Sequence, residues 1–169
     1  PGGRAPSVAS EEALIVWDEA TRTEHFIRRA KFEGAPERFG FLVPTPSRPE
    51  LAEADQEVFT RLTRLFTAPL PRGGSTRRSA GGSPLRSRPV TVVEERRIAG
   101  MQATVLTATD AQALAAWLSQ NGFENRPSLA AWLAPYVRGA FHVTAFRYDP
   151  LAQQTHVATQ AVRLSFRTD

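Results

Sequence analysis

The stretch EALIVWD, residues 12–18, decides the fold, because it is short, apolar and rich in β-branched residues, as β-strands are. Side chains alternate between the two faces of a strand, so Leu14 and Val16 point to one face. Ile15 and Trp17 point to the other face. A strand that is apolar on both faces is typical of a central strand that is covered on both sides. The sequence therefore predicts that this stretch lies inside a sheet.

The segments that flank this strand predict an α+β domain. By the same criteria, strands are expected at residues 24–32, 38–43, 90–98, 101–107, 141–148 and 156–166, and helices at about 56–66, 110–120 and 128–137. Most consecutive strands are joined by short turns, which favours antiparallel pairing. The expected fold class is α+β, a mainly antiparallel sheet with about three helices, in a single domain over residues 1–169.

A five-residue sequence, LAAWL, occurs twice, at residues 114–118 and 129–133. Two helices that pack through small Ala residues and fill the core with Trp would explain it, and a duplicated ligand-binding element is the alternative. The side chains expected to be largely buried are apolar and fall on one face of their elements. They are Trp17, Phe39, Phe41, Val58, Leu62, Leu114, Trp117, Trp132, Leu133, Leu164 and Phe166.

Residues 68–89 are rich in Pro, Gly, Ser and Arg and contain almost no side chains to bury. This composition predicts a long flexible loop inside the domain, where trypsin should cleave first. Between Glu57 and Glu94 there are seven Arg and no acidic residue, so the formal net charge of +4 arises from this interval. The rest of the chain is slightly acidic.

The arginine loop is the first candidate binding site. Its candidate residues are Arg72, Arg77, Arg78, Arg86 and Arg88. Exposed arginines would suit an anionic surface, which leaves three partners open: an acidic protein, lipid headgroups or a cell-envelope polymer. The loop has no aromatic residue for stacking on bases, which disfavours nucleic acid. A solvated loop without a partner is the structural alternative.

The sequence contains no catalytic motif, and no cofactor is expected. The absence of Cys excludes disulfides and thiolate metal sites within this span. Three histidines, His25, His142 and His156, fall in expected strands, and His142 and His156 could meet across a hairpin. A metal-dependent hydrolase that uses them as ligands is therefore one functional hypothesis, although no metal-binding motif supports it.

Three segments together resemble a known bacterial family: residues 13–18 (ALIVWD), 39–46 (FGFLVPTP) and 49–51 (PEL). The chain resembles the family catalogued as domain of unknown function 2330, over most of its length apart from the arginine loop. The resemblance implies an exported bacterial protein and carries no established activity or catalytic residues. It implies a periplasmic, secreted or envelope-associated location.

An export signal or anchor would lie upstream of Pro1 or downstream of Asp169, and residues 1–10 are expected to form a flexible N-terminal segment. No apolar run in the sequence reaches the ~18 residues of a membrane-spanning helix. The leading hypothesis is an extracytoplasmic interaction or assembly protein without catalysis of its own.

Overall fold

The computed structural model describes residues 7–33, 39–65, 89–123, 126–148, 156–158 and 160–168. For residues 7–9, 32–33 and 156–158 it describes the backbone alone. The described strands form two antiparallel sheets. The first sheet has the order β1 (Ser7–Asp18), β2 (Thr23–Glu33), β9 (Val162–Arg167) and β4 (Glu50–Glu53), and β8 (His156–Ala158) also pairs with β2. The second sheet has the order β3 (Phe39–Thr45), β7 (His142–Tyr148), β6 (Met101–Ala108) and β5 (Val90–Ile98).

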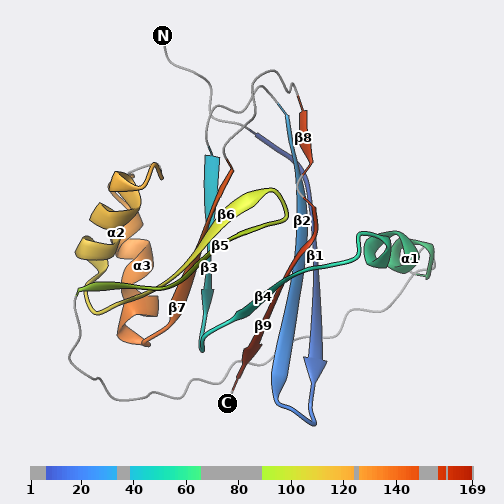
Figure 1. The fold of residues 1–169 in the computed structure, drawn as a ribbon, viewed down its shortest axis with the longest axis horizontal. Helices are drawn as coiled ribbons and strands as arrows, with labels where there is room; N and C mark the ends of the chain where they lie inside the picture. The colour runs from blue at the N-terminus through green and yellow to red at the C-terminus, as the bar shows by residue number, and fades with distance from the viewer. Residues whose placement is uncertain are drawn as a thin grey trace.

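Three helices lie on opposite sides of these sheets. Helices α2 (Ala111–Gln120) and α3 (Leu129–Arg138) pack together on one side of the second sheet (Figure 1). Helix α1 (Glu57–Leu65) lies on the far side of the molecule, beyond β1 (Figure 1). None of the described helices has the length and apolar character that crossing a membrane requires.

The core has two parts, one on each face of the second sheet. Strand β7 shows the alternation, because Phe146 belongs to the cluster between the sheets and Val143 to the cluster under α2 and α3. Leu164 of β9 belongs to the same cluster as Phe146, and Leu118 of α2 belongs to the same cluster as Val143. All four side chains are at most 2% exposed. The second sheet is therefore covered on both faces.

The expected fold class is confirmed, with antiparallel strands and three helices, and the strands divide between two sheets. The hairpin predicted at Ala99–Gly100 joins β5 to β6, and both turn residues have positive φ. Asp110 caps α2, since its Oδ1 accepts a hydrogen bond from the Ala113 N–H at 2.6 Å. Strand β4 was not predicted from the sequence.

The central position predicted for residues 12–18 is wrong. Within the described part of the chain, β1 pairs with β2 alone, so it forms the edge of the first sheet. Its apolar side chains are exposed accordingly: Ile15 by 62%, Trp17 by 49% and Val16 by 42%. A two-faced apolar pattern shows which side chains share a face, and it does not show whether another element of the same chain covers them.

The expected core is confirmed for Leu114, Leu133, Leu164 and Phe166, which are buried. Two of the predictions are wrong, because Trp17 and Trp132 are 49% and 43% exposed. Trp132 lies on the outer side of α3 and Trp17 on the edge strand, and no described element packs a layer over either side chain. The remaining predicted core side chains are partly buried: Phe39, Phe41, Val58, Leu62 and Trp117.

The arginine loop, apart from Pro89, lies outside the described residues, so its predicted flexibility and its cleavage by trypsin stay predictions. The N-terminal segment expected over residues 1–10 overlaps the start of β1, which begins at Ser7.

Candidate functional site

The described strands do not bring the three histidines together. His25 lies in β2 and His156 pairs with Glu33, eight residues further along the same strand. At ~3.3 Å per residue, eight residues separate the two backbones by roughly 26 Å. His142 begins β7 in the other sheet, so it does not meet His156 across a hairpin. In the described ranges, no three His, Asp or Glu residues are grouped so that they could hold a metal ion.

Each of the two described imidazoles has its own local environment. The Nδ1 atom of His25 is 2.8 Å from the Oγ atom of Ser165 on the outer face of the first sheet. His142 is half-buried, and burial together with the nearby charge of Arg48 lowers the pKa of its imidazole. Among the described residues, the buried Nδ1 atom of His142 has no hydrogen-bond partner. A neutral imidazole fits that position better than a charged one.

The candidate arginines Arg72, Arg77, Arg78, Arg86 and Arg88 all lie outside the described residues. Their proposed contact with an anionic partner stays a prediction. The described residues offer a different candidate site, at the open edge of β1.

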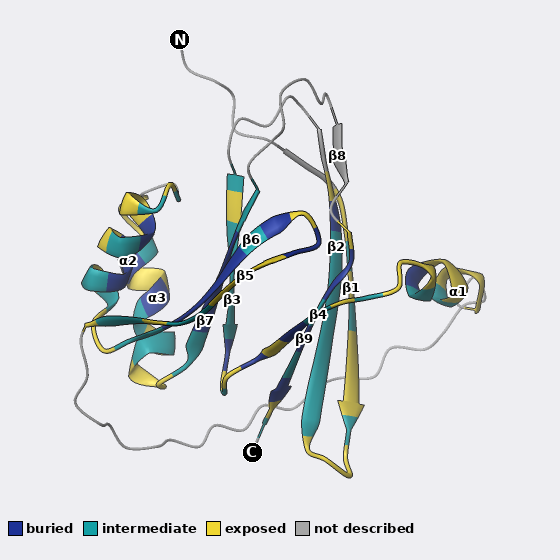
Figure 2. Cartoon of the chain, in the orientation of Figure 1, coloured by how far each residue is buried: buried dark blue, intermediate teal, exposed yellow. Residues whose placement is uncertain are grey.

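The exposed apolar side chains of β1 continue the core of the protein past its covered area. Ile15 lies opposite Phe26 of β2, and Phe26 lies opposite Leu164 of the core between the sheets. Side chains directly opposite each other share one face of an antiparallel sheet, so Ile15 and Trp17 are on the core-facing side. Figure 2 shows the C-terminal half of β1 as exposed, below the region that the second sheet covers.

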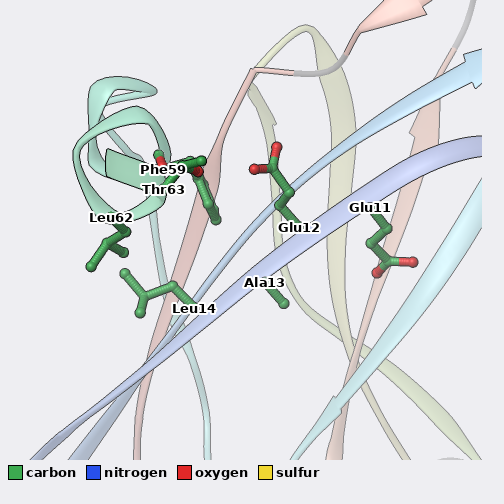
Figure 3. Close-up of a pocket in the computed structure, with 7 residues that line it drawn as sticks. All are labelled: Glu11, Glu12, Ala13, Leu14, Phe59, Leu62 and Thr63. Carbon is green, nitrogen blue, oxygen red and sulfur yellow. Dashed lines mark hydrogen bonds between the residues drawn. The ribbon is translucent and has the colours of Figure 1, made fainter. Parts of the chain in front are cut away.

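An open groove of about 450 Å³ lies between β1 and α1. Figure 3 shows Leu62 of α1 pointing toward Leu14 of β1, with Phe59 and Glu12 further along the groove. The residues that line it are Glu11, Glu12, Ala13 and Leu14 of β1 and Phe59, Leu62 and Thr63 of α1. One wall is thus a strand edge and the other wall is a helix.

Arg29 of β2 holds α1 in this position. Its guanidinium pairs with the carboxylate of Glu12 and lies 4.7 Å from the centre of the Phe59 ring. One of its terminal nitrogens also donates to the carbonyl of Gln56, just before α1, at 3.5 Å. The hydrogen bond from Arg29 lowers the pKa of Glu12, so this carboxylate is charged at neutral pH.

Acidic residues stand at both ends of the apolar run of β1. Glu11 pairs with Arg28, and Glu12 pairs with Arg29. Asp18 instead accepts hydrogen bonds from the backbone N–H of Ala20 and the hydroxyl of Thr21 in the β1–β2 turn, and these contacts lower its pKa. The negative charges of Glu11 and Glu12 are therefore balanced by arginines of β2.

Sequence reasoning missed this site because the order of strands in a sheet is not visible in local periodicity. One signal was present: acidic residues flank the apolar run at 11–12 and at 18–19. Charges beside an apolar strand are typical of edge strands, where they oppose aggregation.

A second aromatic group, of which only Trp132 is exposed, lies on α3 and just after it. The rings of Trp132 and Tyr136 are 5.1 Å apart, and the rings of Tyr136 and Phe141 are 5.6 Å apart. Neighbouring rings are tilted by 57° and 58°, so the three do not form one flat surface. The edge of β1 is the better candidate because it offers backbone hydrogen-bonding groups as well as apolar side chains.

A comparison with protein families gives one match. The model of a family described as an uncharacterized protein conserved in bacteria (DUF2330) matches residues 2–169. Neither the curated proteins nor the solved structures include a match to the chain. The family match spans both sheets, all three helices and the groove beside β1.

Proposed function

The chain belongs to the bacterial DUF2330 family, and we propose that it is a non-catalytic interaction module that binds another polypeptide at the open edge of β1. The proposed location is outside the cytoplasm: in the periplasm, at the cell envelope or in the medium. The sequence resemblance described above implies an exported bacterial protein, and this implication supports the proposed location. The distribution of the histidines supports a binding role over a metal-dependent hydrolase.

The observation that carries the proposal is the row of exposed apolar side chains on the edge strand, led by Ile15 and Trp17. An edge strand presents unpaired N–H and C=O groups, which a strand from another polypeptide can satisfy. Full burial of one large apolar side chain contributes about 1.5–3 kcal/mol. A partner strand that covers this edge would gain both contributions at once.

The test is selection of peptides on the purified chain, followed by hydrogen exchange on the complex. Bound peptides should slow exchange of the β1 amides, because new ladder hydrogen bonds protect them. Ile15→Lys should weaken binding at least tenfold, since it places a charge in the apolar contact. Val92→Lys is the matched control, because Val92 is 47% exposed on β5, the edge strand of the other sheet.

Peptides that bind Ile15→Lys as tightly as the parent chain, or that leave exchange in β1 unchanged, would overturn the binding role of this edge. The location has its own test. The full-length gene product should fractionate with the envelope or the medium of its host bacterium, and recovery with the cytoplasmic proteins would contradict an extracytoplasmic role.

A further inference from the structure

The groove between β1 and α1 restricts what the edge of β1 can accept. Resting on the proposed function, we propose that the partner is a single extended peptide segment that adds to β1 inside this groove. It inserts an apolar side chain between Leu14, Phe59 and Leu62, and it places a basic residue beside the β1–β2 turn. Three observations support this proposal separately: the two walls of the groove, the unfavourable pairing of β1 with a second copy of itself, and the carboxylates beside the β1–β2 turn.

The groove gives an added strand two kinds of contact. The backbone of β1 offers hydrogen-bonding groups along the edge that no other described strand pairs with, and α1 offers side chains from the opposite wall (Figure 3). Leu14 and Leu62 are partly buried, and Phe59 is 5% exposed. They form the apolar end of the groove. Alternate side chains of an added strand point to the same face as Leu14, so one of them enters this apolar space.

The side chains between the inserted ones point to the other face of β1. There they meet Ile15 and Trp17, which are exposed on the core-facing side of the first sheet. Both faces of the added strand therefore contact apolar side chains. The central part of the peptide is accordingly apolar at consecutive positions, not only at alternate ones.

A second copy of this chain fits the edge less well than a peptide of opposite charge. Antiparallel pairing of two β1 strands with full overlap of residues 13–17 sets Ile15 opposite Ile15. The same register sets Glu12 opposite Asp18 and Glu11 opposite Glu19. Like charges directly opposite each other destabilise a strand pair. The acidic flanks therefore disfavour self-pairing and favour a partner with basic flanks.

The two ends of the edge differ in their uncompensated charge. Glu11 and Glu12 each have an arginine partner on β2. Asp18 and Glu19, at the other end, have no ion pair among the described residues, and Asp18 is held by hydrogen bonds in the turn. Two carboxylates without an ion pair to the described residues therefore stand beside the turn, where Arg22 is the one basic residue of the turn itself. A basic residue of the peptide is most favourable at that end.

The test uses synthetic peptides with an apolar centre, measured by fluorescence anisotropy against the intact chain. One peptide carries Lys at the end that lies by the turn, a second carries Glu there, and a third has N-methyl groups on alternate amides of the centre. The Lys peptide should bind roughly three- to fivefold more tightly than the Glu peptide, because exposed ion pairs contribute little. Salt should reduce this difference. N-methylation should abolish binding, because it removes donors needed for strand pairing.

Two variants of α1 separate the groove from the edge. Leu62→Asp should weaken binding of the Lys peptide at least tenfold, since it puts a carboxylate in the apolar end of the groove. Thr60→Asp, on an exposed position of the same helix, should leave affinity unchanged. Leu62→Ala, which is gentler to folding, should give a smaller loss in the same direction. Urea unfolding of each variant checks that the fold is retained.

The outcomes distinguish this inference from the proposed function. Peptides that need Ile15 but show no dependence on Leu62 and no preference for Lys would overturn the groove inference and leave the edge as the binding site. Binding that does not need Ile15 would overturn the proposed function itself. Sedimentation of the chain without peptide should show a monomer. A dimer that Ile15→Lys dissociates would replace the peptide by a second copy as the occupant.

Discussion

Strands β6 and β1 carry the same kind of sequence, yet among the described residues only β6 is covered on both faces. Both have apolar side chains on both faces. In β6, Val105 faces the core between the sheets, Leu106 faces α2 and α3, and both are 0% exposed. In β1, Ile15 and Trp17 lie on the core-facing side and Val16 on the outer side, and these side chains are 62%, 49% and 42% exposed. A two-faced apolar strand needs cover on both sides, and the cover can come from the same chain or from another one.

The largest expected difference between the two strands is in stability. Leu106→Ala should lower the free energy of unfolding by about 3 kcal/mol, because it removes buried contacts and leaves a cavity. Ile15→Ala should lower it by less than about 1 kcal/mol, because the side chain is 62% exposed and little burial is lost. Urea unfolding followed by tryptophan fluorescence measures both values. Equal losses would mean that β1 is covered as well as β6 is.

The second difference, between β3 of the second sheet and the edge strand β1, is in how well each tolerates added side-chain volume. A Cβ at Gly40 of β3 would lie 2.4 Å from a ring carbon of Phe123 and 2.9 Å from the carbonyl oxygen of Phe146. Gly40→Ala should therefore cost about 1–3 kcal/mol, as overpacking does. Ala13→Val on the exposed edge should change stability by less than about 0.5 kcal/mol. The same unfolding measurement tests the pair, and a tolerated Gly40→Ala would show that Phe123 moves away freely.

How much of this comparison could be predicted depends on the range of the forces involved. Periodicity and turn chemistry are local, so the sequence predicted the β5–β6 hairpin, the α2 cap and the alternation in β1. The order of strands depends on contacts between distant residues, such as Leu164 with Phe26. The edge position of β1 and the exposure of Trp17 and Trp132 therefore could not be obtained from local patterns.

The candidate site was hidden for the same reason. Its two walls come from Leu14 and Leu62, which lie far apart in the sequence, and neither belongs to a recognisable motif. The helix was predicted with Leu62 on its apolar face, but the strand that this face approaches was not. The two identical LAAWL segments also differ in their surroundings, since Trp117 packs against the core while Trp132 is 43% exposed. Local sequence alone therefore does not determine which of the two Trp side chains is buried.

A smaller effect is expected at the helices that cover the second sheet. Asp110→Ala should cost about 1 kcal/mol, because it removes the hydrogen bond to the Ala113 N–H at the start of α2. Ser128 precedes α3 in the same way but makes no side-chain capping bond. Ser128→Ala is therefore the matched control and should cost a few tenths of a kcal/mol at most. Equal effects in thermal unfolding would contradict the assignment of the cap.

The smallest expected effect is the dependence of stability on pH at His142, where the second sheet meets solvent. Burial lowers the pKa of this imidazole below its ordinary value of 6.5. The unfolded chain therefore takes up a proton at a higher pH than the folded chain does, and stability should fall as the pH drops below about 6.5. The fall should level off once the pH is below the pKa in the folded state, because both states are then protonated.

His142→Gln should reduce the slope of stability against pH between about 7 and 5, because the amide does not titrate. Glu12 and Asp18 do not obscure the measurement. Their lowered pKa values make their contribution present above about 4.5 and lost only as the pH falls further. Urea unfolding at a series of pH values compares the two chains. The same slope in both would show that His142 is solvated in the folded state, and that the covered sheet does not extend to the start of β7.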